Sequence, residues 1–365
     1  MDRPVRVLYI SPVSERGGAE AVLMNILKFH DRHAFEPIVC FLRPGPLVDE
    51  AARHGTRVVT LQAERIRNLP ASLGLVRTIR QLIRTERIDI VFGNMASGHV
   101  FGGLAALATD AKAVWYQHGI PSAGDPIDLL AAMIPSARIY CNSLVTADAQ
   151  GRLPNGCARL QVVHPGIDVA AFVPKPSRPR RPVVATIARL QHWKGQDVLL
   201  RAARTVVDRR PDVGFLLIGD TLFGREPEYA THLRELVSSL GLSAHVSFAG
   251  HCDDVAKRLD DVDIVVHPHR RPEPFGLAIA EAMLMEKPVI ASGIGGPAEF
   301  ITNGESGVLI PPEDADALAQ SILDLLDDPA KRAVLGRAGR AVVLRAFSMD
   351  RMIRDLETSY RSLLN

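Results

Sequence analysis

The chain has 365 residues, a formal net charge of +2, 47% hydrophobic residues and 5% aromatic residues. Its length favours two domains, and its composition is typical of a well-packed globular protein and excludes a disordered chain. The small net charge and the scarcity of aromatic side chains argue against a nucleic-acid partner.

Short runs of β-branched residues alternate with helical patterns in the first half of the chain. Strands separated by helices of about ten to fifteen residues predict βαβ units and a mostly parallel sheet. The expected strands are residues 5–10, 35–42, 57–61, 88–92, 112–116, 138–141 and 160–163.

The loop after the first expected strand contains a glycine pair, Gly17-Gly18. Two glycines allow a tight turn and a close approach of the backbone to a ligand, as in phosphate-binding loops. The spacing matches neither the dinucleotide fingerprint nor the P-loop, so it does not indicate dinucleotide or ATP binding. Taken alone, the pair indicates an ordinary turn more than a ligand site.

Residues 72–87 have the pattern of an amphipathic helix with a basic side. The basic side carries four arginines, Arg77, Arg80, Arg84 and Arg87, and Leu73 is one of the apolar residues expected opposite them. A basic amphipathic helix can lie on an anionic membrane. The pattern favours the alternative, a helix that covers the first sheet and keeps its arginines in water.

His118 follows the expected strand at residues 112–116 and so lies at its carboxyl end. Ligands of doubly wound sheets collect at this edge. An isolated histidine more often makes a structural hydrogen bond than it serves in catalysis. The position of His118, and not its residue type alone, makes it a candidate site residue.

Four prolines between residues 174 and 182 mark a Pro/Arg-rich linker. Prolines at this density cannot continue a helix or pair inside a sheet. The linker separates a first domain, residues 1–173, from a second, residues 183–346, and the fold class is α/β with two Rossmann-like, doubly wound domains facing across a cleft. The strands expected in the second domain are residues 183–187, 213–218, 245–248, 263–267 and 288–291.

Arg189 and Lys194 lie on the loop that follows the first strand of the second domain. Two cations beside a helix N-terminus, which repels cations, are unfavourable unless an anion joins them. A diphosphate would do so, with the arginine as a bidentate fork and the lysine as a point charge. Ordinary surface charge is the alternative.

The segment that begins at Glu273 follows the fourth strand of the second domain. Glu273 precedes a proline and should lie outside the next helix, and Pro274 suits the first helical turn. Backbone amides at this helix end would then face an anion. These amides belong to Phe275, Gly276 and Leu277.

Glu281 lies two turns into the same expected helix, about 10 Å along its axis. This separation is too long for the carboxylate pair of a retaining glycosidase, which stands about 5 Å apart. It suits two contacts to the ends of one elongated ligand. The alternative is an amphipathic helix with two solvated glutamates.

Neither a metal site nor a disulfide frame is predicted. Asp261 and Asp263 imitate an Asp-x-Asp metal site, but they precede a buried-looking strand, where capping and solvation of the strand entrance explain them better. The four cysteines stand singly, which suits a reducing compartment. No stretch approaches the length of a signal peptide core or a membrane span, so we expect a cytoplasmic protein.

These motifs resemble, in order and spacing, those of the large retaining glycosyltransferase family 4, which has the GT-B fold. The resemblance covers the second half nearly end to end and the first half mainly at its loops. It implies an acceptor-binding domain at residues 1–173, a nucleotide-sugar-binding domain at 183–346, and a helix at 347–365 that crosses back to the first domain. Further matching segments are Pro165–Asp168, Gly293–Glu299 and Asn303–Pro312.

The resemblance also implies roles for the second-domain residues. Arg189 and Lys194 would grip the diphosphate of the donor, and Glu281 would bind the ribose hydroxyl groups. Glu273 and the amides of Phe275 to Leu277 would hold the sugar and the distal phosphate.

From the first domain, Gly17 and Gly18 would approach the diphosphate, and His118 would face the reacting carbon of the sugar. The implied reaction transfers a hexose with retention at the anomeric carbon, without a metal or a cofactor. The cations would stabilise charge that grows on the diphosphate in the transition state, and the leaving diphosphate would accept the acceptor's proton.

Two alternatives remain. The GT-B fold also serves nucleotide-sugar epimerases, and a protein of another class could bind nucleotide sugar as a non-catalytic partner of a transferase. The expected donor is a UDP- or GDP-sugar, and the expected acceptor is a polysaccharide or glycolipid intermediate, with a natural-product precursor as a further alternative. Peripheral contact with the inner membrane face through residues 72–87 stays an open expectation.

Overall fold

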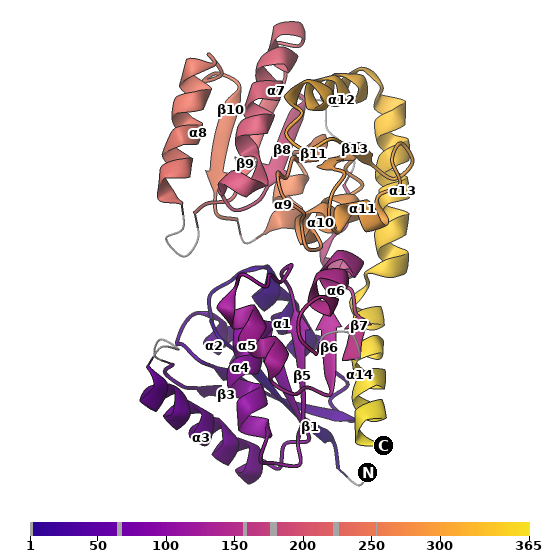
Figure 1. The fold of residues 1–365 in the computed structure, drawn as a ribbon. Coiled ribbons are helices and arrows are strands. Elements are labelled where there is room, and N and C mark those ends of the chain that lie inside the picture. Colours follow the sequence, from indigo (N-terminus) through magenta and orange to yellow (C-terminus); the bar gives the residue numbers. More distant parts are fainter. Residues whose placement is uncertain (1–2, 64–67, 156–158, 176–180, 222–225, 253) are drawn as a thin grey trace. The chain divides into compact units, whose positions relative to one another are not determined.

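The computed structural model describes residues 3–63, 68–155, 159–175, 181–221, 226–252 and 254–365 (Figure 1). The chain forms two compact units. The first comprises residues 1–167 together with 347–365, and the second comprises residues 168–346. Within the described ranges, no helix is both long enough and apolar enough to cross a membrane.

The first unit is built on a parallel sheet of seven strands in the order β3-β2-β1-β4-β5-β6-β7. Its strands are β1 (Val5–Ser11), β2 (Phe35–Phe41), β3 (Arg57–Thr60), β4 (Ile90–Asn94), β5 (Lys112–Gln117), β6 (Arg138–Cys141) and β7 (Leu160–Val162). Its helices are α1 (Gly18–Phe29), α2 (Leu47–Arg53), α3 (Leu69–Thr85), α4 (Met95–Ala106), α5 (Pro126–Met133), α6 (Leu144–Gly151) and α14 (Met349–Leu364).

Helices cover both faces of the first sheet. On one face α3 and α4 bury an apolar core that includes Ile10, Ile79 and Phe101. On the other face the rings of Tyr9 and Phe92 pack with Tyr360 of α14. The last helix therefore completes the core of the first unit, although it follows the second unit in the sequence.

The second unit repeats this plan with six parallel strands in the order β10-β9-β8-β11-β12-β13. Its strands are β8 (Val183–Ile187), β9 (Gly214–Ile218), β10 (Val246–Gly250), β11 (Ile264–His267), β12 (Val289–Ser292) and β13 (Val308–Ile310). Its helices are α7 (Gln196–Arg209), α8 (Pro227–Ser239), α9 (Val255–Leu259), α10 (Leu277–Leu284), α11 (Pro297–Phe300), α12 (Ala315–Asp327) and α13 (Pro329–Ala346). Short 3₁₀ turns, η2 (Val169–Ala171) and η3 (His192–Lys194), complete it.

The structure confirms the α/β class and the two Rossmann-like parallel sheets, and it changes three details. The strand β13 was not expected, because three residues are too few to show a period. The helix α10 begins at Leu277 and not near Pro274, because Gly276 takes a left-handed φ of 96° as its N-cap. Leu73, expected on the buried side of its helix, is 56% exposed.

The division between the units falls at Ile167/Asp168, earlier than the boundary predicted at residue 173. The segment after Asp168 joins the second unit, where Arg340 donates to the carbonyl oxygen of Phe172 at 3.1 Å. Residues 176–180 of the predicted linker lie outside the described residues. The C-terminal segment from Phe347 onward belongs to the first unit.

Each sheet has one point where the strand order reverses direction. In the first sheet this switch lies between β1 and β4, and in the second between β8 and β11. Open α/β sheets bind ligands outside the carboxyl ends of the strands at such a switch. A ligand site is therefore expected in the loops that follow these four strands.

Candidate functional site

The loops after β8 and β11 bring Lys194 and Glu273 together at the switch of the second sheet. The Nζ atom of Lys194 lies 2.5 Å from Oε2 of Glu273, and each side chain is only 12% exposed. An ammonium group has three hydrogens to donate, so one engages the carboxylate and two remain for another acceptor. A cation and a carboxylate that the sequence singled out separately thus form one buried pair.

The carboxylate of Glu273 also accepts from His269, whose Nε2 lies 3.0 Å from the same Oε2 atom. Burial alone would raise the pKa of Glu273, but Lys194 and His269 act in the opposite direction and hold that pKa well below its usual range. Glu273 is therefore ionised at neutral pH. It can accept hydrogen bonds and cannot act as a general acid.

Close backbone contacts fix the two loops. The amide of Arg270 donates to the carbonyl oxygen of Trp193 at 2.9 Å, and a Cβ atom at Gly195 would collide with the carbonyl oxygen of Pro268. Gly195 also takes a left-handed φ of 72°, which only glycine adopts without strain. The loop after β8 can lie this close to the loop after β11 only because Gly195 has no side chain.

The backbone of Glu273 is held from its other side by a glycine pair. The amide of Gly296 donates to the carbonyl oxygen of Glu273 at 2.7 Å, and a Cβ atom at Gly295 would lie 2.6 Å from the Glu273 nitrogen. The sequence identified these glycines only as part of a matching segment. The structure shows that they hold the site carboxylate in place.

The start of α10 presents backbone amides next to Glu273. The first hydrogen bonds of this helix run from Ile279 and Ala280 to the carbonyl oxygen of Gly276, at 3.0 and 3.2 Å. The amide groups of Leu277 and Ala278 therefore precede the hydrogen-bond ladder, at the positive end of the helix. Because the helix begins later than Pro274, these two amides differ from the expected set of Phe275, Gly276 and Leu277, and only Leu277 is common to both; anion binding here stays a prediction.

Glu281 lies on the second turn of α10 and is half-buried. Its side chain makes no hydrogen bond or ion pair within the described part of the chain. Burial raises the pKa of this carboxyl group to about 7. A half-buried carboxylate without a partner is unfavourable in the free protein and suits a ligand that donates hydroxyl groups.

Arg189 follows β8 on the same loop as Lys194. Its carbonyl oxygen accepts from the side chain of the fully buried Gln196 at 2.8 Å. The positive charge of Arg189 also contributes to lowering the pKa of Lys194, an effect smaller than that of burial. The two predicted cations thus lie close enough to interact, as a shared anion would require.

The first unit places a separate polar cluster at the carboxyl ends of β4, β5 and β6. Nε2 of His118 lies 2.9 Å from Oδ1 of Asn94, and the side-chain amide of Asn142 donates to the carbonyl oxygen of His118 at 2.7 Å. Burial lowers the pKa of His118 to about 3, so the imidazole is neutral, and Nε2 carries its hydrogen because the amide oxygen opposite it can only accept. The sequence did not identify Asn94 or Asn142, because each is a single amide after a strand.

The glycine pair of the first unit forms the start of α1. Gly17 is the N-cap with an extended backbone, and the helix begins at Gly18. A Cβ atom at Gly17 would lie 2.6 Å from Oε2 of the buried Glu20. Gly17 does not take a left-handed φ, and a side chain there would displace the end of the Glu20 side chain and not a backbone atom.

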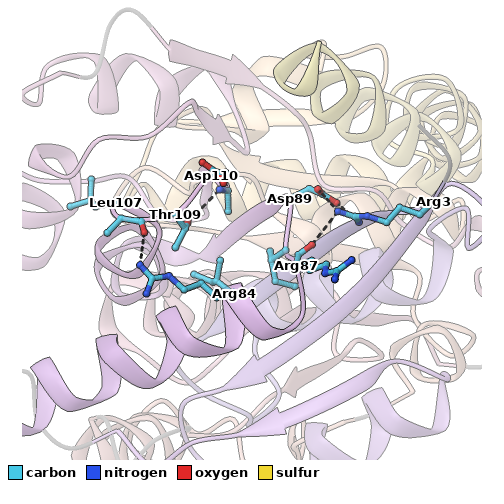
Figure 2. Close-up of a pocket in the computed structure, with 11 residues that line it drawn as sticks. Arg3, Arg84, Arg87, Asp89, Leu107, Thr109 and Asp110 are labelled. Carbon is cyan, nitrogen blue, oxygen red and sulfur yellow. Dashed lines mark hydrogen bonds and ion pairs between the residues drawn. The ribbon is translucent and has the colours of Figure 1, made fainter.

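A groove of about 580 Å³ opens at the amino edge of the first sheet, away from these loops (Figure 2). Two of the three arginines that line it have structural partners: Arg3 donates to both oxygens of Asp89 at 2.8 Å, and Arg84 donates to the carbonyl oxygen of Ala108 at 2.9 Å. Arg80 likewise donates to carbonyl groups at the end of α4. Part of the basic side of α3 thus caps a neighbouring helix, and membrane contact stays a prediction.

The described residues contain no group of three or more histidine, cysteine, aspartate or glutamate side chains placed to hold a metal ion. The carboxylate of Asp263 accepts from the amide of Val183 at 2.8 Å, so it links the start of β11 to the start of β8.

Comparison with known proteins gives matches along most of the chain. Residues 16–171 match a family described as Glycosyltransferase Family 4, and residues 170–342 match one described as Glycosyl transferases group 1. A GDP-mannose-dependent alpha-(1-6)-phosphatidylinositol monomannoside mannosyltransferase of Mycolicibacterium smegmatis is 28% identical over 80% of each chain. A D-inositol 3-phosphate glycosyltransferase of Salinispora tropica is 34% identical over 62% of this chain and 54% of its own length.

Among solved structures, HepE of Anabaena in complex with UDP and glucose has a TM-score of 0.86. It is 25% identical, and the match covers 98% of this chain and 100% of that one. The neighbours confirm the GT-B fold for the chain.

Proposed function

The chain belongs to glycosyltransferase family 4, and on that premise we propose that it is a retaining glycosyltransferase. It moves a hexose-type sugar from a UDP- or GDP-sugar to a polysaccharide or glycolipid acceptor. Its named relatives support this class of acceptor, because one glycosylates a phosphatidylinositol mannoside and others take part in lipopolysaccharide core biosynthesis.

The observation that carries the proposal is the buried Lys194–Glu273 pair at the switch of the second sheet. Lys194 and Arg189 bind the diphosphate, and the transition state benefits because negative charge grows there as the glycosidic bond breaks. Glu273 is ionised and accepts hydrogen bonds from the sugar. The reaction needs neither a carboxylic acid pair nor a metal ion, because these cations stabilise the leaving group.

The remaining donor contacts follow from the other polar groups. Glu281 binds the two ribose hydroxyl groups, and the amides at the start of α10 bind the distal phosphate and the sugar. We assign His118 to the sugar near its reacting carbon, and Gly17 and Gly18 to the diphosphate.

The first experiment is a thermal-shift screen of the purified chain against UDP, GDP, ADP and their common sugars. A ligand at 100 times its dissociation constant stabilises the protein by about 2.7 kcal/mol. Lys194→Ala and Glu281→Ala should lose the shift. Lys331→Ala on α13 and Glu235→Ala on α8 change exposed residues of the same types and should keep it. A protein that no nucleotide stabilises would contradict the proposal.

The second experiment follows transfer itself. With the donor identified, sugar release and product formation should depend on an added acceptor, and NMR of the product should show the anomeric configuration of the donor. Activity should survive a chelator. Change of the donor sugar without any acceptor would instead indicate an epimerase, and an inverted product would refute retention.

A further inference from the structure

His269 is a buried histidine that the sequence did not identify and that the proposed roles do not use. It lies on the loop between β11 and Glu273 and is 2% exposed. Its Nε2 atom contacts Oε2 of Glu273 at 3.0 Å, and its buried Nδ1 atom has no partner in the described ranges. Burial of a polar ring is unfavourable unless hydrogen bonds compensate for the lost water, so a buried histidine indicates a structural or functional role.

The hydrogen positions of this contact follow from its chemistry. An ionised carboxylate only accepts, so the hydrogen between His269 and Glu273 belongs to Nε2 of the ring. Burial lowers the pKa of His269, and the Glu273 carboxylate opposes this effect. In its neutral form His269 is therefore the Nε2–H tautomer, and it donates one hydrogen bond of fixed direction.

One aromatic side chain supports both donors to Glu273. The rings of Trp193 and His269 stack with centroids 5.7 Å apart and an interplanar angle of 28°. Lys194 Nζ lies over the same indole, 4.0 Å from its centroid. The ring of His267 stacks on His269 at 5.5 Å.

The charged residue next to His269 in the sequence is paired with carboxylates other than Glu273. Arg270, the next residue, forms ion pairs with Asp197 of α7 at 2.5 Å and with Glu313. The charged groups that act on His269 are Glu273 and Lys194.

These contacts leave Glu273 with one engaged and one available oxygen. Its backbone is held by Gly296, and its Oε2 atom accepts from both Lys194 and His269. No hydrogen-bond partner of its Oε1 atom occurs among the residues that the structure describes. Two donors from different directions on one oxygen fix the plane of the carboxylate, and so the direction of the other oxygen.

We propose that His269 is a positioning residue that holds Oε2 of Glu273 so that Oε1 accepts a hydroxyl group of the donor sugar. This inference rests on the proposed function, because it assumes a nucleotide-sugar donor. Lys194 alone cannot supply the constraint, since a single flexible donor leaves the carboxylate free to rotate about the shared oxygen. The sugar contact, and not the nucleotide contact, depends on His269.

The test compares three substitutions that differ in where they place an N–H group. The side-chain amide of His269→Gln can take the position of Nε2, whereas that of His269→Asn reaches only the position of Nδ1. His269→Leu keeps the volume and has no donor. The wild type and each variant are measured for their affinity for the nucleoside diphosphate and for kcat/KM with the nucleotide sugar.

We expect His269→Leu and His269→Asn to lower kcat/KM by about tenfold or more, which corresponds to the loss of one hydrogen bond to a charged group. Their affinity for the nucleoside diphosphate should stay within about twofold of the wild type, and His269→Gln should recover most of kcat/KM. Equal loss in the Gln and Asn variants, or equal loss of diphosphate binding, would show a purely structural role and overturn the inference.

The design also separates this inference from the proposed function. A wild type that neither binds nor transfers any nucleotide sugar would refute both. A wild type that transfers sugar, beside an equally active His269→Leu variant, would refute only the positioning role. If the leucine variant does not fold, the comparison of the glutamine and asparagine variants decides.

Discussion

Two glutamates of the second unit lie in opposite electrostatic environments. Glu273 has two hydrogen-bond donors on one oxygen, and its pKa lies well below the usual range. Glu281 has no partner in the described residues, and burial raises its pKa to about 7. One carboxylate is thus preorganised by the protein, whereas the other depends on a ligand for its hydrogen bonds.

This contrast predicts how donor binding depends on pH. The ribose hydroxyl groups donate to an ionised Glu281, so binding must remove its proton below a pH of about 7. The dissociation constant of the nucleotide sugar should therefore be about tenfold higher at pH 6 than at pH 8. Calorimetry across this range tests the effect, and Glu281→Gln should bind weakly with a flat profile. A flat wild-type profile would contradict the role of Glu281.

Glu281 should also lower the stability of the free protein. Its pKa rises on folding from 4.5 to about 7, so its cost is absent below pH 4.5, grows as pH rises through that interval and is complete above pH 7. Glu281→Gln removes the ionisable group and should stabilise the unliganded protein by about 1–2 kcal/mol at pH 8. Thermal midpoints at pH 8 and pH 4.5 test this, with Glu235→Gln as an exposed control. An unchanged midpoint at pH 8 would refute the burial argument.

At the scale of elements, the site depends on loops that only glycine allows to approach one another. Gly195 lies against Pro268, Gly219 against Ala188, and Gly295 against Glu273, and in each case a Cβ atom would collide with a backbone oxygen. The strands fix the sheet, but these contacts fix where the loops place their charges. Loop glycines therefore contribute to function because they have no side chain, which lets two loop backbones come into contact.

Gly195→Ala tests this view against a matched control. Gly195 and Gly241 have similar left-handed φ angles, 72° and 65°, but only Gly195 has a backbone oxygen in the way of a Cβ atom. Gly241→Ala should cost about 1 kcal/mol of stability from backbone strain alone. Gly195→Ala should cost more and weaken nucleotide binding at least tenfold, because the loop carrying Lys194 must move. Equal costs in thermal and binding measurements would count against the close-approach argument.

The sequence predicted the elements better than it predicted the contacts between them. Short apolar runs between helical patterns placed every strand of the two sheets except β13, since buried parallel strands have a local signature. The start of α10 was placed too early, because Pro274 suggested a first turn and the left-handed Gly276 cannot be read from residue types. The sequence did not identify His269, because its contact with Glu273 depends on the folded loops, which the backbone contacts of Gly195 and Gly296 hold in place.

At the scale of the whole molecule, the chain leaves the first unit after Ile167 and returns to it at Phe347. The residues at these two points are hydrogen-bonded to each other. Ile167 donates to the carbonyl oxygen of Phe347 at 2.8 Å, and Met349 donates to that of Ile167 at 3.2 Å. A Cβ atom at Gly166 would lie 2.7 Å from the sulfur of Met349. The start of α14 is thus attached to the end of the first unit's main segment.

The helix α14 then binds the first unit through a buried polar cluster. Nδ1 of His30 lies 2.9 Å from Oε1 of Glu357, which also accepts from the amide of Asp31 at 3.1 Å. The hydroxyl of Tyr140 donates to Ser359 at 2.8 Å. Because Glu357 is 7% exposed and His30 is 4% exposed, these bonds form out of contact with bulk water, where an unpaired group is costly.

Removal of the Glu357 acceptor should therefore weaken one unit and leave the proposed function of the other intact. Glu357→Leu leaves the buried donors of His30 and Asp31 without an acceptor and should destabilise the first unit by about 2–4 kcal/mol. Glu357→Gln keeps an acceptor and should cost less. Hydrogen exchange should accelerate in α1 and α14 of the leucine variant. Nucleotide affinity should change much less than in Lys194→Ala, because the four side chains proposed to bind the donor, those of Arg189, Lys194, Glu273 and Glu281, all lie in the second unit, and the first unit contributes only the backbone at Gly17 and Gly18. If Glu357→Leu weakened nucleotide binding as much as Lys194→Ala does, the second unit could not be the independent donor-binding module that its own sheet and core indicate.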